Sequence, residues 1–259
     1  MVGVDRLTRF NYFKWEPKFA HVKPYVLLMD KPAGHHDFPE TNFDVETGPD
    51  EVVVDMRDRE TEFHLDRHGF AVRKSGWPLG VELPLVGDAV GLVQDWYLPA
   101  MQRMLKDEFG DAIETFFFDW RLRSNNPVQT ELDVGMTVDL TDATLRLTPL
   151  KLVHVDQSPQ GAMNRVLHHM GDRASDLLKG RVRVINLWRP LVESVQDCPL
   201  AVCDGSSVPM ANCLTADLSE STMCCNNVGE SMCPLQGGGH YRWHYLSRQT
   251  KDEVLMLKM

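Results

Sequence analysis

The chain has 259 residues, 43% of them hydrophobic and 25% charged, which is enough to form the core of one large domain or of two small ones. Its formal net charge of -10 argues against nucleic acid or an anionic membrane as the main partner, because either would require a basic face. There is no run near the roughly 20 apolar residues of a membrane helix and no signal-peptide pattern, so we expect a cytoplasmic protein.

The first part of the chain alternates between short apolar runs and turn-rich segments, of which 31–50 is expected to be a loop. Over residues 88–109 apolar side chains recur at helical spacing. Gly110 is typical of a helix C-terminus, and Pro99 is expected to kink or divide the helix. The β-type segments predicted here are strands at 24–30, 51–58 and 112–122, and a hairpin over 61–75 that turns at 66–69.

The second part begins with another polar loop, 124–144, after which an apolar strand ends in "HVD" at Asp156. A helix is predicted to follow over 159–178, with Ser158 as its N-cap and Gly180 at its end. Further strands are predicted at 181–191, 199–204, 240–246 and 253–259.

Many short strands and few helices predict a mainly β protein with flanking helices (α+β), built on a jelly-roll core. Several strands are far apart in sequence, which favours antiparallel, Greek-key-like connections. No shift in composition divides the chain, so we expect a single domain over 1–259. In it, the N-terminal strands and helix, about 1–125, pack on the jelly-roll part, about 126–259.

The segment "LKLVHVDQSPQGAM", residues 150–163, contains the first candidate site. Because side chains alternate along a strand, His154 and Asp156 project to one face and Val155 to the other. An imidazole and a carboxylate side by side are two parts of a mononuclear metal site. A hydrogen-bonded ion pair at a strand end is the structural alternative, and the spacing alone does not decide between them.

Two histidines and one carboxylate on one face of a metal form the facial triad of non-haem Fe(II) oxygenases, which leaves three positions open. These positions bind a co-substrate such as 2-oxoglutarate, and then O2. The carboxylate of the co-substrate needs an arginine partner, because a guanidinium matches its geometry. The candidates follow two predicted strands: Arg189 comes after Trp188, and Arg121 and Arg123 come after "FFFDW".

A third ligand could come from the late strand, where His240 and His244 are four residues apart and could face the same side. A surface or packing role is the alternative for each of them. The other histidines are predicted to be solvated or structural. On the predicted helix, His169 should be more exposed than His168, because it lies off the apolar stripe.

Four blocks, in order, resemble the AsaB-type hydroxylase/desaturase family, which is mainly fungal and includes a gibberellin desaturase. The blocks are "VHVDQSPQGAMNRV", "LLKGRVRVINLWRPL", "VQDCPLAVCDGSSV" and "YRWHYLSRQTKDEVLMLKM". The N-terminal "NYF", the segment "VVVDMRDRETEFHLDRHGF" and the strand ending in Arg121 and Arg123 fit this family too. The resemblance therefore covers nearly the whole chain.

The resemblance implies a double-stranded β-helix fold and an Fe(II)/2-oxoglutarate-dependent dioxygenase of secondary-metabolite biosynthesis. It implies that His154 and Asp156 are the first two iron ligands and that Arg189, in the W-R-P block, lies near the active site. Fe(II) and 2-oxoglutarate are then the expected cofactors. The expected reaction is hydroxylation or desaturation of a small apolar molecule, which is polyketide, terpenoid or peptide-derived.

The C-terminal end departs from the family pattern. In relatives, the strand matching "DEVLMLKM" continues into a segment with the distal histidine and an arginine for 2-oxoglutarate, and this sequence stops at Met259, before both. Three explanations stay open: an incomplete gene model, a shortened protein without oxidative chemistry, and a replacement ligand, His240 or His244. We expect the first, because a jelly roll that ended here would leave sheet edges unpaired.

Among the residues present, the predicted site consists of His154 and Asp156 as catalytic metal ligands and His240 as the third ligand. Arg189 and Arg123 are the predicted cofactor-binding arginines. The alternative function is a metal-independent isomerase or cyclase on the same scaffold, in which His154 and Asp156 act as an acid/base pair. An inactive shortened homologue is the other alternative.

Overall fold

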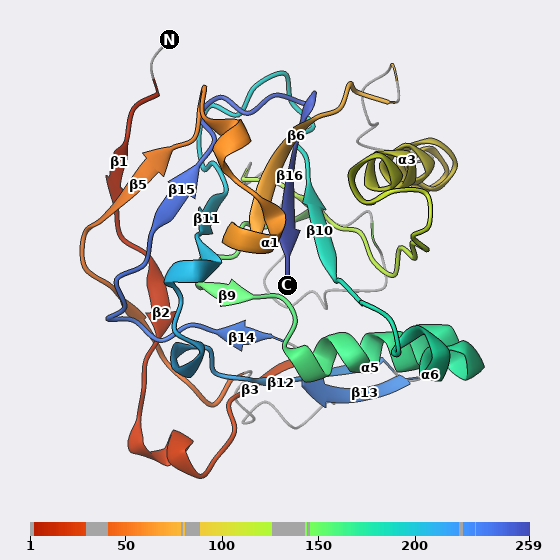
Figure 1. Cartoon of the computed structure of the whole chain (residues 1–259). Coiled ribbons are helices and arrows are strands. Elements are labelled where there is room, and N and C mark those ends of the chain that lie inside the picture. Colours follow the sequence, from red (N-terminus) through yellow and green to blue (C-terminus); the bar gives the residue numbers. More distant parts are fainter. Residues whose placement is uncertain are drawn as a thin grey trace.

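The computed structural model describes residues 3–29, 41–78, 80, 89–125, 143, 146–222, 225–230 and 232–259. Residues 31–40 of the loop predicted at 31–50 and most of the loop predicted at 124–144 lie outside the described residues. The described part of the first loop contains a short strand, Val45–Thr47, which the sequence did not predict. Figure 1 shows that strands occur along the whole chain and that the longer helices lie outside the central sheets. None of the described helices is long and apolar enough to cross a membrane.

The strands are β1 (Arg6–Thr8), β2 (Asn11–Phe13), β3 (Tyr25–Met29), β4 (Val45–Thr47), β5 (Glu51–Asp55), β6 (Phe70–Lys74), β7 (Leu122–Arg123), β8 (Arg146–Leu147), β9 (His154–Val155), β10 (Ile185–Trp188), β11 (Ala201–Cys203), β12 (Asp217–Thr222), β13 (Cys225–Glu230), β14 (Cys233–Pro234), β15 (Trp243–Tyr245) and β16 (Glu253–Lys258). The helices are α1 (Leu65–His68), α2 (Ala89–Leu92), α3 (Leu98–Phe109), α5 (Pro159–Met170) and α6 (Ala174–Leu177).

Two sheets form the centre of the protein. One has the strand order β1-β5-β15-β11, and the other has the order β10-β16-β6. Because β5 pairs with β15 and β6 pairs with β16, strands from the two ends of the chain share each sheet. The prediction of a mainly β protein with flanking helices is confirmed. The smaller sheets are β13-β12-β3, β14-β9, β2-β4 and β7-β8.

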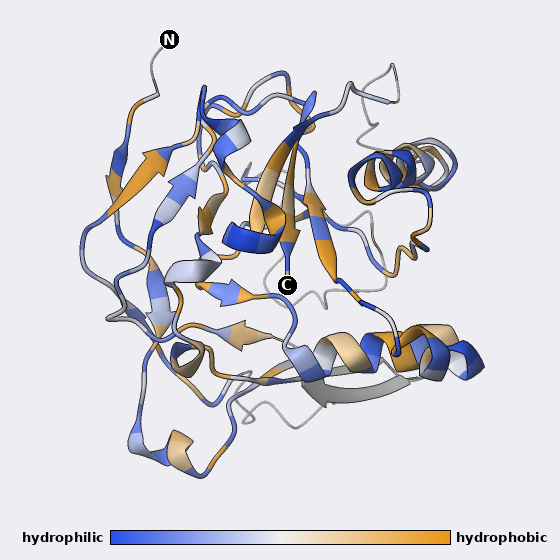
Figure 2. Cartoon of the chain, viewed as in Figure 1, coloured by the Kyte–Doolittle hydropathy of each residue, from blue (hydrophilic) through white to orange (hydrophobic). Residues whose placement is uncertain are grey.

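Side chains from both central sheets meet in one apolar cluster. Phe70 of β6 and Leu255 of β16 pack there with Val202 of β11, which comes from the other sheet. Full burial of a side chain of this size stabilises the fold by about 1.5–3 kcal/mol. The cluster therefore holds the two sheets together, and Figure 2 shows the apolar residues along β6 and β16. Its buried members are Met56, Phe63, Phe70, Val72, Val202, Leu246 and Leu255.

The opposite face of the β10-β16-β6 sheet is covered by α3. Met101 and Leu105 of this helix pack on Val254 and Met256 of β16. Both faces of β16 are therefore covered, and the four consecutive residues Glu253–Met256 are all buried. This explains why the β16 sequence is a continuous apolar run after its first residue instead of an alternating one.

Both predicted helices form, and each is interrupted. In the first, a π-helical turn at Val93–Tyr97 joins α2 to α3, immediately before the first turn of α3, where Pro99 lies. Gly110 follows α3 with a φ of 89°, which favours glycine. In the second, Gly171 ends α5 with a φ of 51°, and a 3-10 turn leads into α6.

Two predicted β segments are wrong. In place of the first half of the hairpin over 61–75 there is the helical turn α1, which ends at Gly69 with a φ of 83°, and only β6 is a strand. The strand predicted at 112–122 is reduced to β7. Its apolar side chains pack against two helices instead of lining a sheet: Phe117 packs in the α3 cluster, and Phe116 contacts α5.

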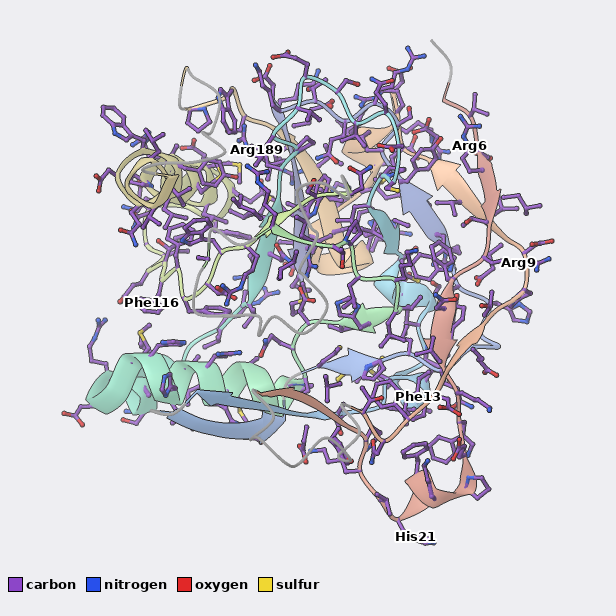
Figure 3. All side chains as sticks on the ribbon, turned by 180° about the vertical axis from the view of Figure 1, so that it is seen from behind. Arg6, Arg9, Phe13, His21, Phe116 and Arg189 are labelled. Atoms are coloured by element: carbon purple, nitrogen blue, oxygen red, sulfur yellow. The ribbon has the colours of Figure 1, made fainter. Side chains whose placement is uncertain are left out.

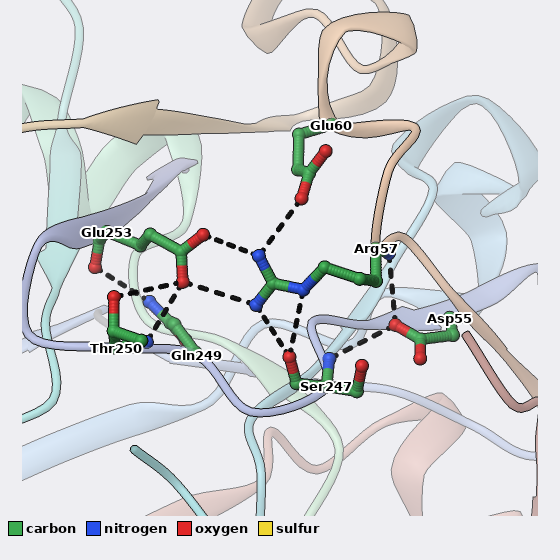
Figure 4. Close-up of polar contacts among 7 residues, drawn as sticks. All are labelled: Asp55, Arg57, Glu60, Ser247, Gln249, Thr250 and Glu253. Atoms are coloured by element: carbon green, nitrogen blue, oxygen red, sulfur yellow. Dashed lines mark hydrogen bonds and ion pairs between the residues drawn. The ribbon is translucent and has the colours of Figure 1, made fainter. Parts of the chain in front are cut away.

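A charged cluster joins the end of β5 to the start of β16 (Figure 4). Arg57 donates to the two carboxylate oxygens of Glu253 at 2.5 and 3.2 Å, and to the carbonyl oxygen of Ser247. The backbone N–H of Thr250 donates to the same carboxylate at 2.9 Å. The side chain of Glu253 is 8% exposed, so water competes little with these bonds.

We predict that Glu253→Gln lowers the free energy of unfolding by about 2–4 kcal/mol at pH 7, because Arg57 loses the more buried of its two carboxylate partners and keeps only Glu60. Burial alone would raise the pKa of Glu253, but the bonds from Arg57 and Thr250 outweigh it and hold that pKa below its usual value. The carboxylate therefore stabilises the fold fully above about pH 4.3, its pKa in the unfolded chain, and this contribution is lost as the pH falls through the folded-state pKa.

Urea unfolding of the parent and the Glu253→Gln protein between pH 7 and pH 3 measures this difference, which should narrow towards acid pH. Glu62→Gln is the control, because Glu62 pairs with Arg59 at an exposed position and should change the free energy of unfolding much less. A difference that stays constant over the whole pH range would contradict the prediction.

Candidate metal site

His154 and Asp156 lie at the end of β9 and face each other. His154 Nε2 is 2.9 Å from Asp156 Oδ1. Val155 points the other way, into an apolar cluster that contains Val153 and Leu235. The predicted shared face of His154 and Asp156 is confirmed, although the strand that carries them is only two residues long.

The segment around β9 is anchored on both sides. β9 pairs with β14, so that His154 lies opposite Pro234. The backbone N–H of Val153 donates to the carbonyl oxygen of Asn11 at 2.9 Å. After the pair, the Ser158 hydroxyl accepts from the N–H of Gly161 at 2.9 Å and begins α5, as predicted. The backbone at His154 and Asp156 is thus held by contacts before and after them.

Hydrogen bonds set the charges of the pair. The Nδ1–H of His154 donates to the carbonyl oxygen of Leu152 at 2.7 Å, so Nε2 is the ring nitrogen that faces Asp156. Burial alone would lower the pKa of His154, but the hydrogen bond and charge of Asp156 outweigh it and raise that pKa. Burial would likewise raise the pKa of Asp156, which His154, Asn186 and Arg123 instead hold below its usual value. Each member of the pair therefore stabilises the charged form of the other.

Asn186 of β10 completes the arrangement. Its side-chain Nδ2–H donates to Asp156 Oδ2 at 3.0 Å. Sequence reasoning missed this residue, because its partner is 30 positions away in the chain. The one available signal was an asparagine inside a predicted strand, where asparagine is depleted.

Arg189 lies on the opposite face of β10 from Asn186. Its guanidinium Nη1 donates to the carbonyl oxygens of Ser75 and Lys251 at 2.8 and 2.6 Å. The guanidinium also lies 5.7 Å from the ring centre of Tyr97, beside α3 (Figure 3). Burial lowers its pKa. Arg189 is thus a buried link between segments, and its cofactor-binding role stays a prediction from the sequence.

The alternation of side chains along β10 explains the position of Arg189. Asn186 and Arg189 are separated by three positions, an odd number, so they point to opposite sides of the strand. Ile185 and Leu187, on the side of Arg189, pack in the α3 cluster. Trp188, on the side of Asn186, packs in the cluster between the two central sheets.

Of the other predicted arginines, Arg123 is the one placed near the pair. Its Nη1 donates to the carbonyl oxygen of Thr148 at 2.7 Å. Its charge helps to lower the pKa of Asp156 and partly opposes the rise in the pKa of His154. Arg121 instead pairs with Asp119, with 3.3 Å between Nη2 and Oδ1. Positive charge at the site therefore comes from Arg123.

The predicted third ligand is not placed beside the pair. His240 is exposed and precedes β15, because the strand predicted at 240–246 begins only at Trp243 and pairs with β5 and β11. The ring of His244 packs on Phe63 and Phe70 at centroid distances of 4.9 and 5.7 Å. Within the part of the chain that the structure describes, no three His, Cys, Asp or Glu side chains are grouped so that they could hold a metal ion.

The prediction that His169 is more exposed than His168 is wrong. The His169 ring lies 5.3 Å from the ring of Phe116 and 5.6 Å from that of Phe118, and it is the less exposed of the two histidines. Its burial lowers its pKa. The ring of His169 is covered by the segment that was predicted as a strand at 112–122, since Phe116 of this segment lies beside α5 (Figure 3).

A mainly β domain thus brings together an imidazole and a carboxylate, which are two of the three ligands of a facial triad. Residues 10–259 match the family described as Oxidoreductase/YMDC permease-like domain, and the chain belongs to this family.

Among curated proteins, the chain is similar to the hydroxylase/desaturase CTB9 of Cercospora beticola. The two are 34% identical over 219 residues, which cover 80% of this chain and 64% of that protein. It is 39% identical to the aspirochlorine biosynthesis protein N of Aspergillus oryzae over 103 residues, which cover 40% of this chain and 42% of that protein. The chain thus spans less than two thirds of the length of either relative. The predicted resemblance to fungal hydroxylase/desaturase proteins is confirmed.

Among solved structures, the chain is similar to the iron and alpha-ketoglutarate-dependent endoperoxidase NvfI. The TM-score is 0.75 at 24% sequence identity, with 98% of this chain and 83% of that chain covered. The likeness shows that the two proteins share a fold.

We predict that Arg189→Lys lowers the free energy of unfolding by about 2–3 kcal/mol, because a single ammonium cannot reproduce the two carbonyl contacts and the ring packing of Arg189. The affinity for Co(II) and for 2-oxoglutarate should stay within about twofold of the parent, since the guanidinium faces away from His154 and Asp156.

Urea unfolding and calorimetric titration measure the two quantities. Arg181→Lys is the matched control, because Arg181 pairs with Asp66 at an exposed position. Loss of 2-oxoglutarate binding in a stable Arg189→Lys protein would restore the cofactor role.

Proposed function

We propose that the protein is an oxidoreductase of secondary-metabolite biosynthesis that uses Fe(II), 2-oxoglutarate and O2 to hydroxylate or desaturate a small apolar substrate, on a jelly-roll core. One observation carries the proposal: His154 Nε2 and Asp156 Oδ1 converge at 2.9 Å while their outer atoms are held by Leu152 and Asn186. The similarity of the chain to a hydroxylase/desaturase and to an iron and alpha-ketoglutarate-dependent endoperoxidase supports it.

The donor set and its spacing suit Fe(II). An imidazole nitrogen and a carboxylate oxygen are the ligand types of the facial triad. Two ligands that lie about 2.1 Å from one ion, at right angles, are about 3 Å apart, which is close to the observed separation. A metal-binding histidine commonly donates its other N–H to a backbone carbonyl, as His154 does to Leu152. The side chains of His154 and Asp156 are 20% and 42% exposed, so the pair is accessible.

In this proposal His154 and Asp156 hold the iron, and Arg123 provides positive charge for a carboxylate of 2-oxoglutarate. Iron and 2-oxoglutarate, when bound, supply the activation of O2 that oxidation of a C–H bond requires. Arg123 suits its role because its charge already acts on both members of the pair. Arg189 has no part in the proposed site, because it is buried on the opposite face of β10 from Asn186.

The residues next to the pair on the central sheet support an apolar substrate. Trp188 shares a face of β10 with Asn186, and Leu257 of β16 lies directly opposite Asn186 in the register. Both pack against the cluster between the sheets. A small molecule that reached His154 and Asp156 from this side would meet an indole and a leucine side chain. We therefore propose a polyketide, terpenoid or peptide-derived substrate with an apolar reacting carbon.

A second function has one observation in its favour. His154 and Asp156 are directly hydrogen-bonded, and although burial alone would lower the pKa of His154, the bond to Asp156 and its charge raise it. Such a pair suits general acid/base catalysis. The alternative is therefore a metal-independent isomerase or cyclase in which His154 transfers the proton and Asp156 orients the ring.

We predict that the purified protein binds Fe(II) and that His154→Ala and Asp156→Ala each weaken the binding at least about 100-fold, because loss of a ligand should cost more than loss of an outer partner. Anaerobic calorimetric titration measures the affinity. His240→Ala is the control and should bind Fe(II) as the parent does. Iron binding that depends on His240 instead would contradict this arrangement and support the replacement ligand.

We predict that the Fe(II)-loaded protein converts 2-oxoglutarate to succinate, and that excess EDTA stops the conversion because the chelator removes the iron. Mass spectrometry of the released succinate measures the reaction, with His154→Ala as the negative control. A substrate conversion that continues unchanged in EDTA would favour the isomerase or cyclase.

A further inference from the structure

Asp156 has a separate partner for each of its two carboxylate oxygens. Oδ2 accepts from Asn186 Nδ2 at 3.0 Å, and Oδ1 is 2.9 Å from His154 Nε2. The first partner comes from β10 and the second from β9, so the carboxylate lies between two strands of different sheets. Because Asn186 holds Oδ2, the other oxygen, Oδ1, points in one defined direction, towards His154.

The strand that carries Asn186 is held along its length. β10 pairs with β16, with Asn186 opposite Leu257 and Trp188 opposite Leu255. Just before β10, the carbonyl oxygen of Val184 accepts from the N–H of Met259 at 3.0 Å. A side chain on a paired strand is placed more precisely than one on a loop. The amide of Asn186 is therefore presented to Asp156 from a fixed backbone.

We propose that Asn186 is a positioning residue that sets the rotation of the Asp156 carboxylate and so reserves Oδ1 for a metal ion bound with His154. The inference rests on the proposed iron site and adds a residue to it. The terminal torsion of a carboxylate is broad, so an aspartate without a second partner can turn either oxygen towards His154. The hydrogen bond from Asn186 removes this freedom.

The chemistry of asparagine suits this task. Its amide is neutral, so it orients the carboxylate without cancelling the negative charge that a cation requires. Arg123, by contrast, acts on Asp156 through its charge. A guanidinium in the place of Asn186 would form a salt bridge and compete with the metal for the carboxylate. Asn186 holds Asp156 in place, and the negative charge of the Asp156 carboxylate remains available to a cation.

The experiment compares the affinity for Co(II), used as a spectroscopic probe, in the parent and in Asn186→Leu, which keeps the size of the side chain and removes the donor. Loss of an outer partner of a metal ligand typically weakens metal binding 10–100-fold, and we expect a loss in this range. The visible absorption of bound Co(II) should also change, because the geometry of the Asp156 ligand changes. Asn186→Ala serves as a second variant and should behave in the same way.

Asn164→Leu is the matched control, because it makes the same substitution at a half-buried asparagine of α5, whose side chain accepts from Gln160. It should leave the affinity and the spectrum of Co(II) unchanged. Circular dichroism and urea unfolding confirm that each variant is folded.

The outcomes separate the two proposals. If the parent binds Co(II), Asp156→Ala does not, and both Asn186 variants bind within twofold of the parent with the same spectrum, the positioning role is overturned and the metal site stands. If the parent and Asp156→Ala bind Co(II) equally weakly, the metal site fails and the role of Asn186 fails with it.

Discussion

The β10-β16-β6 sheet is covered by the second sheet on one face and by α3 on the other, and this constraint decides what its polar side chains do. A buried polar group without a hydrogen-bond partner costs about 1–3 kcal/mol, so each one must find a partner inside the protein. Glu253 binds Arg57 at the end of β5. Arg189 binds backbone carbonyls beside β6 and β16. The few polar residues of the sheet thereby connect it to its surroundings.

Asn186 belongs to the same sheet and is exposed to solvent, and this difference places the candidate site at the boundary of the core. Its face of β10 continues into buried apolar packing at Trp188, while Asn186 itself reaches Asp156. The polar donor Asn186 and the apolar side chain of Trp188 therefore lie two residues apart on β10. A site of this kind can bind an ion and an apolar molecule side by side, which is the combination that the proposed oxidation requires.

The predictions from sequence succeeded where the determining contacts are local. The shared face of His154 and Asp156 follows from a two-residue period, and the Ser158 cap follows from the chemistry of one turn. Asn186 could not be predicted as their partner, because the contact depends on how β9 and β10 approach each other in space. Arg189 was assigned from its place after Trp188 at the end of a predicted strand, whereas the odd spacing from Asn186 sends it to the other face. The apolar run around Phe117 was read as a strand, because a sequence does not show that helices cover it.

The pairing of early and late strands has a consequence for the synthesis of the protein. Arg57 and Glu253 lie 196 positions apart, and the early strands β5 and β6 pair with the late strands β15 and β16. Both central sheets therefore stay open on the ribosome until the last of these strands has emerged. During that time unpaired strand edges of the nascent chain are exposed to other chains. The yield of folded protein in a recombinant host will depend on how well chaperones shield those edges. Slower translation should raise this yield less than it does for proteins whose sheets close one strand after another during synthesis.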